Sequence, residues 1–456
     1  MFTLIIDSLL IFSMITPIIG FFTSKKSSCL ICGAVSTGGY IISIIYLLHL
    51  LPQILENPIR IPGKTSPVHT SIIIDVPGSL MTLLALVLGL FATIYSMRFM
   101  ERDSGTPLYY SLLMAMIAGI VGASYSGDLL TLFIFWELMS ITSFVLVAFE
   151  KERWEPIEAG FKYLVMSTAG SLVALFGISL IYSSAGTLSI SSLTTSLVAT
   201  HTIAIAATML IVGFGVKASM VPLHTWLPDA HPAAPSGISA MLSGIVIQSG
   251  LIAMLKCLMV IPGGIPIGTS LIIFSVITMT VGNVMALVQR DVKRLLAYSS
   301  IAHMGYILLG MGIGFQYNVL TGFDGGLFHV MTHALMKGLA FLCAGAILYR
   351  LGTRDLAEMR GIGHKMPITC FSFAVAALSL SAAPPLAGFM SELLIIKAGI
   401  ESASQIGALG VLLALIVLLN CILSLGYYLP LIRTLFLSPE KEFNVEEAPI
   451  AMLVPM

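Results

Sequence analysis

One carboxylate, Glu137, lies in the middle of a long apolar stretch, within LFIFWELMSIT at residues 132–142. Neither end of the stretch is close enough for a short carboxylate to reach water. A charge at the centre of a bilayer costs about 2.5–3.5 kcal/mol, so such residues normally face a bundle interior or a water path. Glu137 is therefore a candidate for ion transfer. A structural ion pair or a protonated, hydrogen-bonded carboxyl group is the alternative.

A second ionisable group, Lys217, precedes a predicted helix break in VGFGVKASMVPLHTWLPDAHPAAPS. Prolines follow it at short intervals, at Pro222, Pro228, Pro232 and Pro235. Proline breaks helices, and a break frees carbonyls that can hold a cation or water, so Lys217 is the natural partner of Glu137. His224, Asp229 and His231 would line or cap the break, unless this segment is only a rigid turn.

A third group occupies one helix face in LFHVMTHALMKGLAFL, where His329, His333 and Lys337 recur every four residues. They would span about 12 Å along the helix axis. No carboxylate or cysteine accompanies the histidines at metalloprotease spacing, which argues against a metal site. The pattern favours a proton relay, with interhelical hydrogen bonds as the alternative.

The last of these groups, Glu392, follows a break predicted at Pro384 and Pro385 in FSFAVAALSLSAAPPLAGFMSELLIIKAG. His303 adds a titratable group in LAYSSIAHMG. The basic cluster before it reads as a membrane-surface anchor, although Lys293 could reach inward.

The composition indicates an integral membrane protein. Of 456 residues 57% are hydrophobic and 10% charged, with a mean hydropathy of +1.00, against about 25% charged residues in soluble domains. Apolar runs of about 20 residues, long enough to cross a bilayer, recur throughout. Thirteen helices are predicted, near residues 3–22, 29–50, 77–98, 108–126, 128–149, 156–183, 201–221, 235–260, 266–289, 295–315, 322–349, 366–400 and 406–436.

The connecting segments carry two further predictions. RIPGKTSPVHTSIIID has turn residues and a β-branched end, which predicts a small hairpin outside the bilayer. Loops after odd-numbered helices hold sixteen of the twenty-two Lys and Arg residues, and loops after even-numbered helices hold only Arg60 and Lys64. This asymmetry predicts that the protein lies in the cell membrane with the odd-numbered loops facing the cytoplasm and the N-terminus on the outer side.

Several functions are disfavoured by composition and motifs. The formal net charge is zero, which gives no indication of nucleic acid binding. Only Cys29 and Cys32 have C-x-x-C spacing, without a second Cys or His pair nearby. No haem, iron–sulfur, nucleotide or flavin motif is recognisable, so no cofactor or metal is predicted.

Five stretches resemble the antiporter-like proton-channel subunits shared by respiratory complex I, Mrp-type cation/proton antiporters and membrane-bound hydrogenases. They are FWELMS, VKASMVPLHTWLPDAHPAAPS, DVKRLLAYSSIAHMGY, FHVMTHALMKGLAFL and PPLAGFMSELLI. The resemblance implies an all-α polytopic fold of about fourteen transmembrane helices, with two inverted five-helix repeats that each contain a broken helix. We expect four segments: residues 1–107 with three helices and the hairpin, half-channels at 108–264 and 265–437, and residues 438–456. The last of these ends in APIAMLVPM, which looks like the start of a fourteenth helix that stops short of spanning, either because the chain is cut here or because its end lies on the surface.

The resemblance also implies roles for individual residues. Glu137 and Lys217 match the charge pair of the first half-channel. Lys337, with His329 and His333, matches the central relay, and Glu392 the terminal group. Where many relatives carry a central lysine this chain has Gln248, which cannot hold a proton charge. Lys256 follows two turns later, nearer the membrane surface.

Three functions compete at this point. The first is a proton-translocating, or sodium-translocating, subunit of a redox-driven or Mrp-type complex, with no redox centre of its own. Its partners would be lipid, further antiporter-like and small helical membrane subunits, and a peripheral redox arm. The second is an independent secondary cation/proton antiporter. The third, a membrane enzyme or scaffold, does not fit the file of titratable groups.

Overall fold

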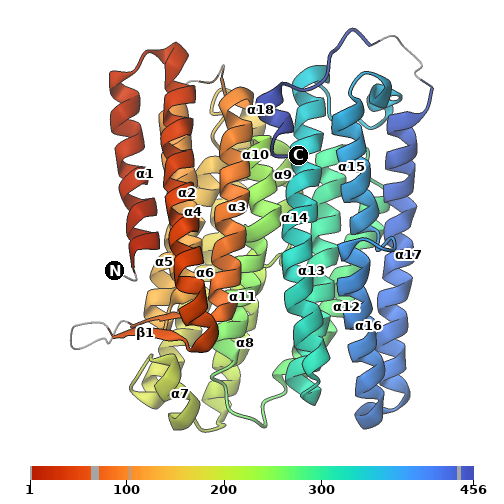
Figure 1. Cartoon of the computed structure of the whole chain (residues 1–456). Coiled ribbons are helices and arrows are strands. Elements are labelled where there is room, and N and C mark those ends of the chain that lie inside the picture. Colours follow the sequence, from red (N-terminus) through yellow and green to blue (C-terminus); the bar gives the residue numbers. More distant parts are fainter. Residues whose placement is uncertain (1–2, 63–70, 102, 104, 439–442) are drawn as a thin grey trace. The chain divides into compact units, whose positions relative to one another are not determined.

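The protein is described by a computed structural model that covers residues 3–62, 71–101, 103, 105–438 and 443–456 (Figure 1). It consists of two compact units. Unit 1 comprises Met1–Ala218 and Ala233–Ile265, and unit 2 comprises Ser219–Pro232 and Pro266–Met456. Three of the basic loop residues, Lys64, Arg102 and Lys441, lie outside the described residues.

Within the described residues, the secondary structure of unit 1 is helical apart from one hairpin. Its helices are α1 (Leu4–Phe22), α2 (Lys25–Glu56), α3 (Val76–Phe99), α4 (Thr106–Tyr125), α5 (Leu129–Val147), α6 (Trp154–Ala185), α7 (Ile190–Ser196), α8 (His201–Lys217), α10 (Ser236–Met241), the π-helical turn η1 (Leu242–Val246) and α11 (Ile247–Leu258). Aspartates begin two of the long helices: Asp75 accepts from the Gly78 N–H at 2.8 Å, and Asp128 from the Thr131 N–H at 2.8 Å. Such caps satisfy the amides that a helix start leaves unpaired.

Unit 2 begins with residues 219–232, which include most of α9 (Leu227–Ala233). It continues with α12 (Ile267–Leu287), α13 (Val292–Tyr317), α14 (Leu320–Leu351), the 3₁₀ turns η2 (Ala357–Met359) and η3 (Ile362–His364), α15 (Pro367–Leu380), α16 (Ala387–Ile406), α17 (Ala408–Phe436) and α18 (Ile450–Leu453). α13 is central, because it packs against α12, α14 and α16. The 18-residue stretch of α13 that is apolar enough to span a membrane is buried along its whole length.

Eleven helices within the described residues are long and apolar enough to span a membrane. They coincide with eleven of the thirteen predicted segments. The other two are the segments in which prolines predicted a break, and their apolar helices His201–Lys217 and Pro367–Leu380 are shorter. The apolar runs and the two proline breaks in the sequence therefore account for where these helices lie along the chain.

The two breaks have the same local form. α8 ends at Lys217 and Ser219 has a φ of 54°; α15 ends at Leu380 and Ala382 has a φ of 55°. A left-handed residue two positions after each helix end turns the chain away from the axis. The helix predicted over residues 201–221 ends four residues early, at Lys217. The prediction was wrong because the turn at Ser219 precedes Pro222.

The predicted hairpin is confirmed. β1 (Ile59–Pro62) pairs antiparallel with β2 (Ser71–Ile74), and residues 63–70 lie outside the described residues. The Ser71 N–H donates to Asp128 Oδ2 at 2.8 Å, which ties the hairpin to the start of α5.

In unit 2, α12 and α13 are in backbone-to-backbone contact. A Cβ atom added to Gly282 would lie 2.6 Å from the Ala302 nitrogen, and one added to Gly305 would lie 2.5 Å from the Met279 nitrogen. Small residues allow this approach, which is typical of membrane helix pairs. The contact brackets His303, so it sets the position of that ring.

Gly282→Val should separate α12 from α13 and lower the thermal stability of the purified protein, since overpacking typically costs about 1–3 kcal/mol. Gly38→Val is the matched control, because nothing lies within 4 Å of a Cβ atom at Gly38. Equal melting temperatures for the two variants would contradict the packing described for Gly282.

Candidate functional site

In unit 1, Lys217 is buried at the end of α8 and is held by hydroxyl groups. It is 1% exposed, and its Nζ donates to Ser143 Oγ and to Ser167 Oγ, both at 3.3 Å. The ammonium also lies 4.5 Å from the centroid of the Tyr163 ring, a cation–π distance. The serines replace the water that a charged lysine would otherwise need.

Glu137 is near this lysine but does not contact it within the described part of the chain. It lies on α5, Oε1 has no hydrogen-bond partner, and its charge acts on Lys217 across the gap between them. The predicted pairing is therefore an electrostatic one. Rotation of either side chain, or a water molecule between them, would change its strength.

Gln248 and Lys256 both lie on α11. Gln248 is fully buried just after the π-helical turn η1, and π-turns often mark functional sites. Lys256 Nζ donates to the carbonyls of Ser124 at 2.5 Å and Ser126 at 2.8 Å. Lys256 thus closes the C-terminal end of α4, where a cation is favoured.

In unit 2, Lys337 lies on α14 and is surrounded by oxygen atoms. It is fully buried, and Nζ donates to the Leu296 carbonyl at 3.0 Å, to Tyr428 Oη at 3.2 Å and to Ser299 Oγ. These partners come from α13 and α17. Three helices therefore hold one ammonium.

The histidines form a hydrogen-bonded cluster next to this lysine. His303 Nδ1 lies 3.0 Å from His329 Nε2, and His329 Nδ1 lies 2.9 Å from Ser391 Oγ. The His303 and His333 ring centroids are 5.2 Å apart. The sequence placed His329 and His333 on one face of a helix, and the structure adds His303 from α13.

Glu392, on α16, is the last titratable side chain in the series formed by Lys337 and the histidine cluster. Its Oε1 lies 3.9 Å from His303 Nδ1 and Oε2 accepts a hydrogen bond from Cys421 Sγ at 2.7 Å. His303, His329 and Glu392 have donor atoms within 4.8 Å of one another, close enough to hold a metal ion. The two ring nitrogens are at hydrogen-bond distance, however, which favours a shared proton.

Residues 219–232, expected to line the first break, divide into separate roles within unit 2. His231 is buried, stacks on Phe341 at 4.6 Å and interacts electrostatically with Lys337 and Lys293. Lys293 does point inward, since it is 1% exposed. Asp229 instead pairs with the exposed Arg294 at 3.6 Å.

His224 lies apart from these groups. It is partly exposed, and its Nδ1 has no hydrogen-bond partner within the described residues. Of the three residues predicted to line or cap the break, only His231 therefore joins the buried cluster.

Sequence reasoning missed the polar residues that hold these groups in place. They are Ser143, Ser167, Ser299, Ser391, Cys421 and Tyr428, and each is buried. A lone hydroxyl in an apolar helix is common, so its neighbours across the bundle must be known before it gains meaning.

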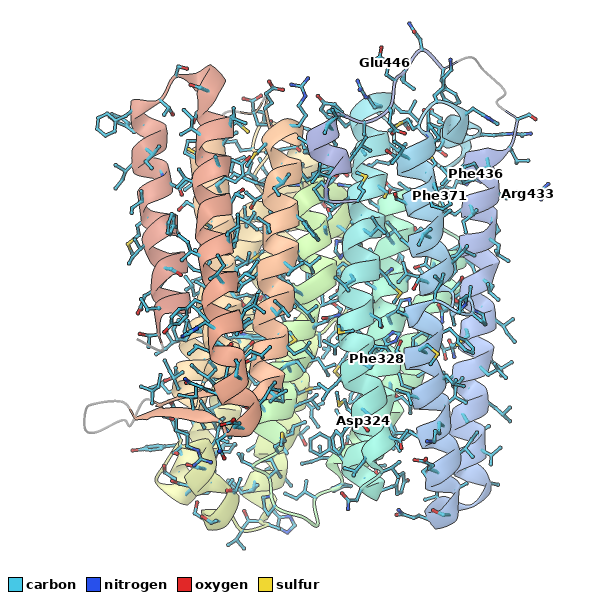
Figure 2. All side chains as sticks on the ribbon, viewed as in Figure 1. Asp324, Phe328, Phe371, Arg433, Phe436 and Glu446 are labelled. Atoms are coloured by element: carbon cyan, nitrogen blue, oxygen red, sulfur yellow. The ribbon has the colours of Figure 1, made fainter. Side chains whose placement is uncertain are left out.

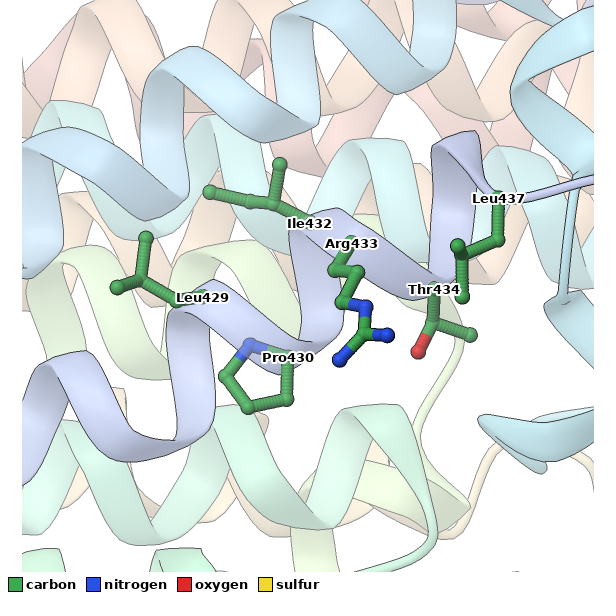
Figure 3. Close-up of a pocket in the computed structure, with 6 residues that line it drawn as sticks. All are labelled: Leu429, Pro430, Ile432, Arg433, Thr434 and Leu437. Carbon is green, nitrogen blue, oxygen red and sulfur yellow. The ribbon is translucent and has the colours of Figure 1, made fainter.

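The outer surface of unit 2 has a different character. Phe371 of α15 and Arg433 and Phe436 of α17 lie toward the same end of the unit (Figure 2). Asp324 and Phe328 lie on α14, toward the other end of the unit. Figure 3 shows a shallow hollow along α17 that is lined by Leu429, Pro430, Ile432, Arg433, Thr434 and Leu437. The hollow is open and mostly apolar, as expected for a surface that faces lipid.

The comparison with known proteins decides the family. Residues 126–418, well over half of the chain, match the family described as NADH:quinone oxidoreductase/Mrp antiporter, transmembrane. The chain belongs to this family. The match covers Glu137, Lys217, Lys337 and the histidines.

Individual members of the NADH:quinone oxidoreductase/Mrp antiporter family agree with this. The F(420)H(2) dehydrogenase subunit N of Methanosarcina mazei is 31% identical over 80% of this chain and 75% of its own length. The NADH-quinone oxidoreductase subunit N of Desulforudis audaxviator is 30% identical over 87% and 81%. A chain of the archaeal membrane-bound sulfane sulfur reductase superposes with a TM-score of 0.89 at 26% identity, covering 99% of this chain and 92% of that one.

Lys256→Met should destabilise the protein, because it leaves two buried carbonyls without their donor at about 1–3 kcal/mol. The measurement is the thermal midpoint in detergent. Lys397→Met is the matched control: Lys397 is 61% exposed, and its one ion pair within the described residues is with Glu401 at 3.5 Å. If Lys256→Met melts with the wild type, the capping role is wrong.

Proposed function

We propose that this chain translocates protons across the cell membrane as one subunit of a multisubunit complex. The observation that carries the proposal is a buried series of titratable side chains in unit 2, in which Lys337 is followed by His333, the His303–His329 pair and finally Glu392. Every member is at most 2% exposed. So many costly groups in one apolar bundle are typical of a proton relay.

The chemistry of the file favours protons over sodium. Imidazole nitrogens both accept and donate protons, and His303 and His329 already share a hydrogen bond. Hard cations prefer a shell of oxygen ligands, and here ring nitrogens occupy the middle of the path. If sodium were the transported ion, transport would stop when sodium is removed from the medium.

The contacts give an order of transfer. Lys337 holds a proton among oxygen atoms that cannot remove it. His333 lies one turn earlier on the same helix and interacts with it electrostatically. From there the proton passes to the His303–His329 pair, and then to Glu392, which is 3.9 Å from His303. Water would complete the longer steps.

Glu137 supplies a switch in unit 1. Two unit charges 4 Å apart interact by about 4 kcal/mol at an effective dielectric of 20, and more weakly when they are farther apart. Moving one charge through 100 mV costs about 2.3 kcal/mol. A change in the Glu137–Lys217 interaction is therefore of the size needed to load or release a proton against a membrane potential.

The relatives support a role within a larger assembly rather than as an independent antiporter. Two are named as subunits of dehydrogenase or oxidoreductase enzymes, and the structural neighbour belongs to a respiratory membrane complex. We infer that this chain is accompanied by further membrane subunits and a peripheral redox arm that provides the energy. The Lys and Arg asymmetry of the loops supports an N-terminus outside the cell.

Glu137→Gln in the assembled complex should abolish coupled proton transport while assembly persists, because the switch charge is lost. Proton uptake by inverted membrane vesicles measures this. Glu158→Gln is the control, since Glu158 forms an exposed ion pair with Lys162 at 2.8 Å. Retained transport in Glu137→Gln would exclude the switch role.

Ser391→Ala should slow transport several-fold with normal assembly, since it removes a hydrogen bond worth about 0.5–1.5 kcal/mol from the His329 ring. Ser402→Ala is closely matched: Ser402 is also fully buried on α16 and bonds a backbone carbonyl, but not a histidine. Equal rates in the two variants would remove Ser391 from the relay.

A further inference from the structure

Three buried side chains from different helices of unit 2 bring metal-binding atoms together. They are His303 on α13, His329 on α14 and Glu392 on α16, and each is at most 2% exposed. One donor atom from each residue lies within 4.8 Å of the other two. Because the donors come from three helices, their spacing along the chain does not reveal them.

Two imidazole nitrogens and one carboxylate oxygen are a ligand set that suits zinc. Zinc sites with two histidines and one glutamate are known, and they leave a fourth position for water. Hard cations such as calcium and magnesium take oxygen ligands instead. The donor set therefore favours a transition metal ion of the zinc class, for which imidazole is a good ligand.

The distances between the donor atoms are close to those of a tetrahedral zinc site. Zinc bonds at tetrahedral angles place neighbouring ligand atoms about 3.3–3.4 Å apart. His303 Nδ1 lies 3.0 Å from His329 Nε2 and 3.9 Å from Glu392 Oε1. The first distance is about 0.3 Å too short for zinc and the second about 0.5 Å too long. Rotation of the three side chains can supply both changes, so no helix needs to move.

The hydrogen bonds of His329 leave its Nε2 available as a ligand. Ser391 Oγ lies 2.9 Å from His329 Nδ1 and also donates to the Gly388 carbonyl at 2.9 Å. A hydroxyl has one hydrogen and a carbonyl can only accept, so Nδ1 is the donor to Ser391 and Nε2 carries the lone pair. Metal-bound histidines are oriented in the same way, by a hydrogen bond from the ring nitrogen that does not bind the metal.

The carboxylate of Glu392 is held by one oxygen only. Cys421 Sγ donates to Oε2 at 2.7 Å, whereas Oε1 has no hydrogen-bond partner within the described residues. A buried carboxylate oxygen without a partner is costly. Oε1 is also the oxygen nearer to His303, so a metal ion between them would supply the missing positive partner.

We propose that His303, His329 and Glu392 form a zinc site, and that zinc bound there stops proton transfer. Zinc would occupy the nitrogen lone pairs between which a proton is otherwise shared. It would also add two positive charges near Lys337, whose charge already acts on His303. The blocking effect rests on the proposed function, whereas zinc binding does not.

Zinc bound to the purified, assembled complex measures the site directly. The complex is dialysed against zinc until the bound amount is constant, since the ligands are at most 2% exposed, and bound zinc is counted by elemental analysis. Glu392→Gln and His303→Gln should each bind one zinc ion fewer per complex than the wild type. Zinc-edge X-ray absorption should assign nitrogen and oxygen ligands at about 2.0–2.2 Å to the ion that is lost.

Glu137→Gln is the matched control, because it removes a carboxylate from an apolar helix of unit 1. It should bind as much zinc as the wild type. Equal amounts of zinc in the wild type and in the variants at Glu392 and His303 would overturn the proposal.

Zinc on both sides of the membrane should also inhibit proton uptake by inverted vesicles, and a chelator should restore it. Ser391→Ala should need about 10–100-fold more zinc for half inhibition, because it removes the partner of a metal-bound histidine. Ser402→Ala should behave as the wild type, since Ser402 bonds the Gly399 carbonyl on the same helix. An unshifted half-inhibiting concentration for Ser391→Ala would overturn the proposal, even if the variants at Glu392 and His303 fail to assemble.

The two measurements separate this proposal from the proposed function. A complex that transports protons but binds zinc independently of His303 and Glu392 would leave the proton path standing and remove the zinc site. A complex that loses one zinc ion with each variant, yet transports protons at the same rate with zinc bound, would establish the site and overturn the block. The histidines would then lie outside the proton path, and the proposed function would fail at that step.

Discussion

The cost of placing polar groups inside an apolar bundle governs this structure. Lys217, Lys337 and Glu392 are each at most 2% exposed, so none has bulk water to stabilise its charge. Serine and tyrosine hydroxyls, a thiol and backbone carbonyls from neighbouring helices take its place. The same groups that make these residues tolerable also fix where a proton can go next, which links stability to function.

The sequence predicts the architecture well because apolar runs and prolines act locally. Eleven predicted segments correspond to membrane-length helices, and the other two are the broken ones. The end of α8 at Lys217 was not foreseen, because a left-handed turn at Ser219 leaves no distinctive signature in the sequence. Backbone conformation at a single serine depends on what surrounds it.

The candidate site was predicted only as far as residue type allows. Glu137, Lys217, Lys337 and Glu392 stand out as charges in apolar surroundings. Which of them meet could not be read from spacing, because the contacts join helices far apart in the chain. Residue type can also suggest a role that the contacts do not support. Lys256 is a charge in an apolar helix that could have belonged to the proton path, but it caps the C-terminal end of α4 instead.

The close approach of α12 and α13 has a consequence for how the protein moves. Backbones in contact at Gly282 and Gly305 cannot slide past each other without a clash. The ring of His303 is thus mounted on a rigid support, so a change in its hydrogen bonding is expected to come from rotation of side chains rather than from sliding of these two helices.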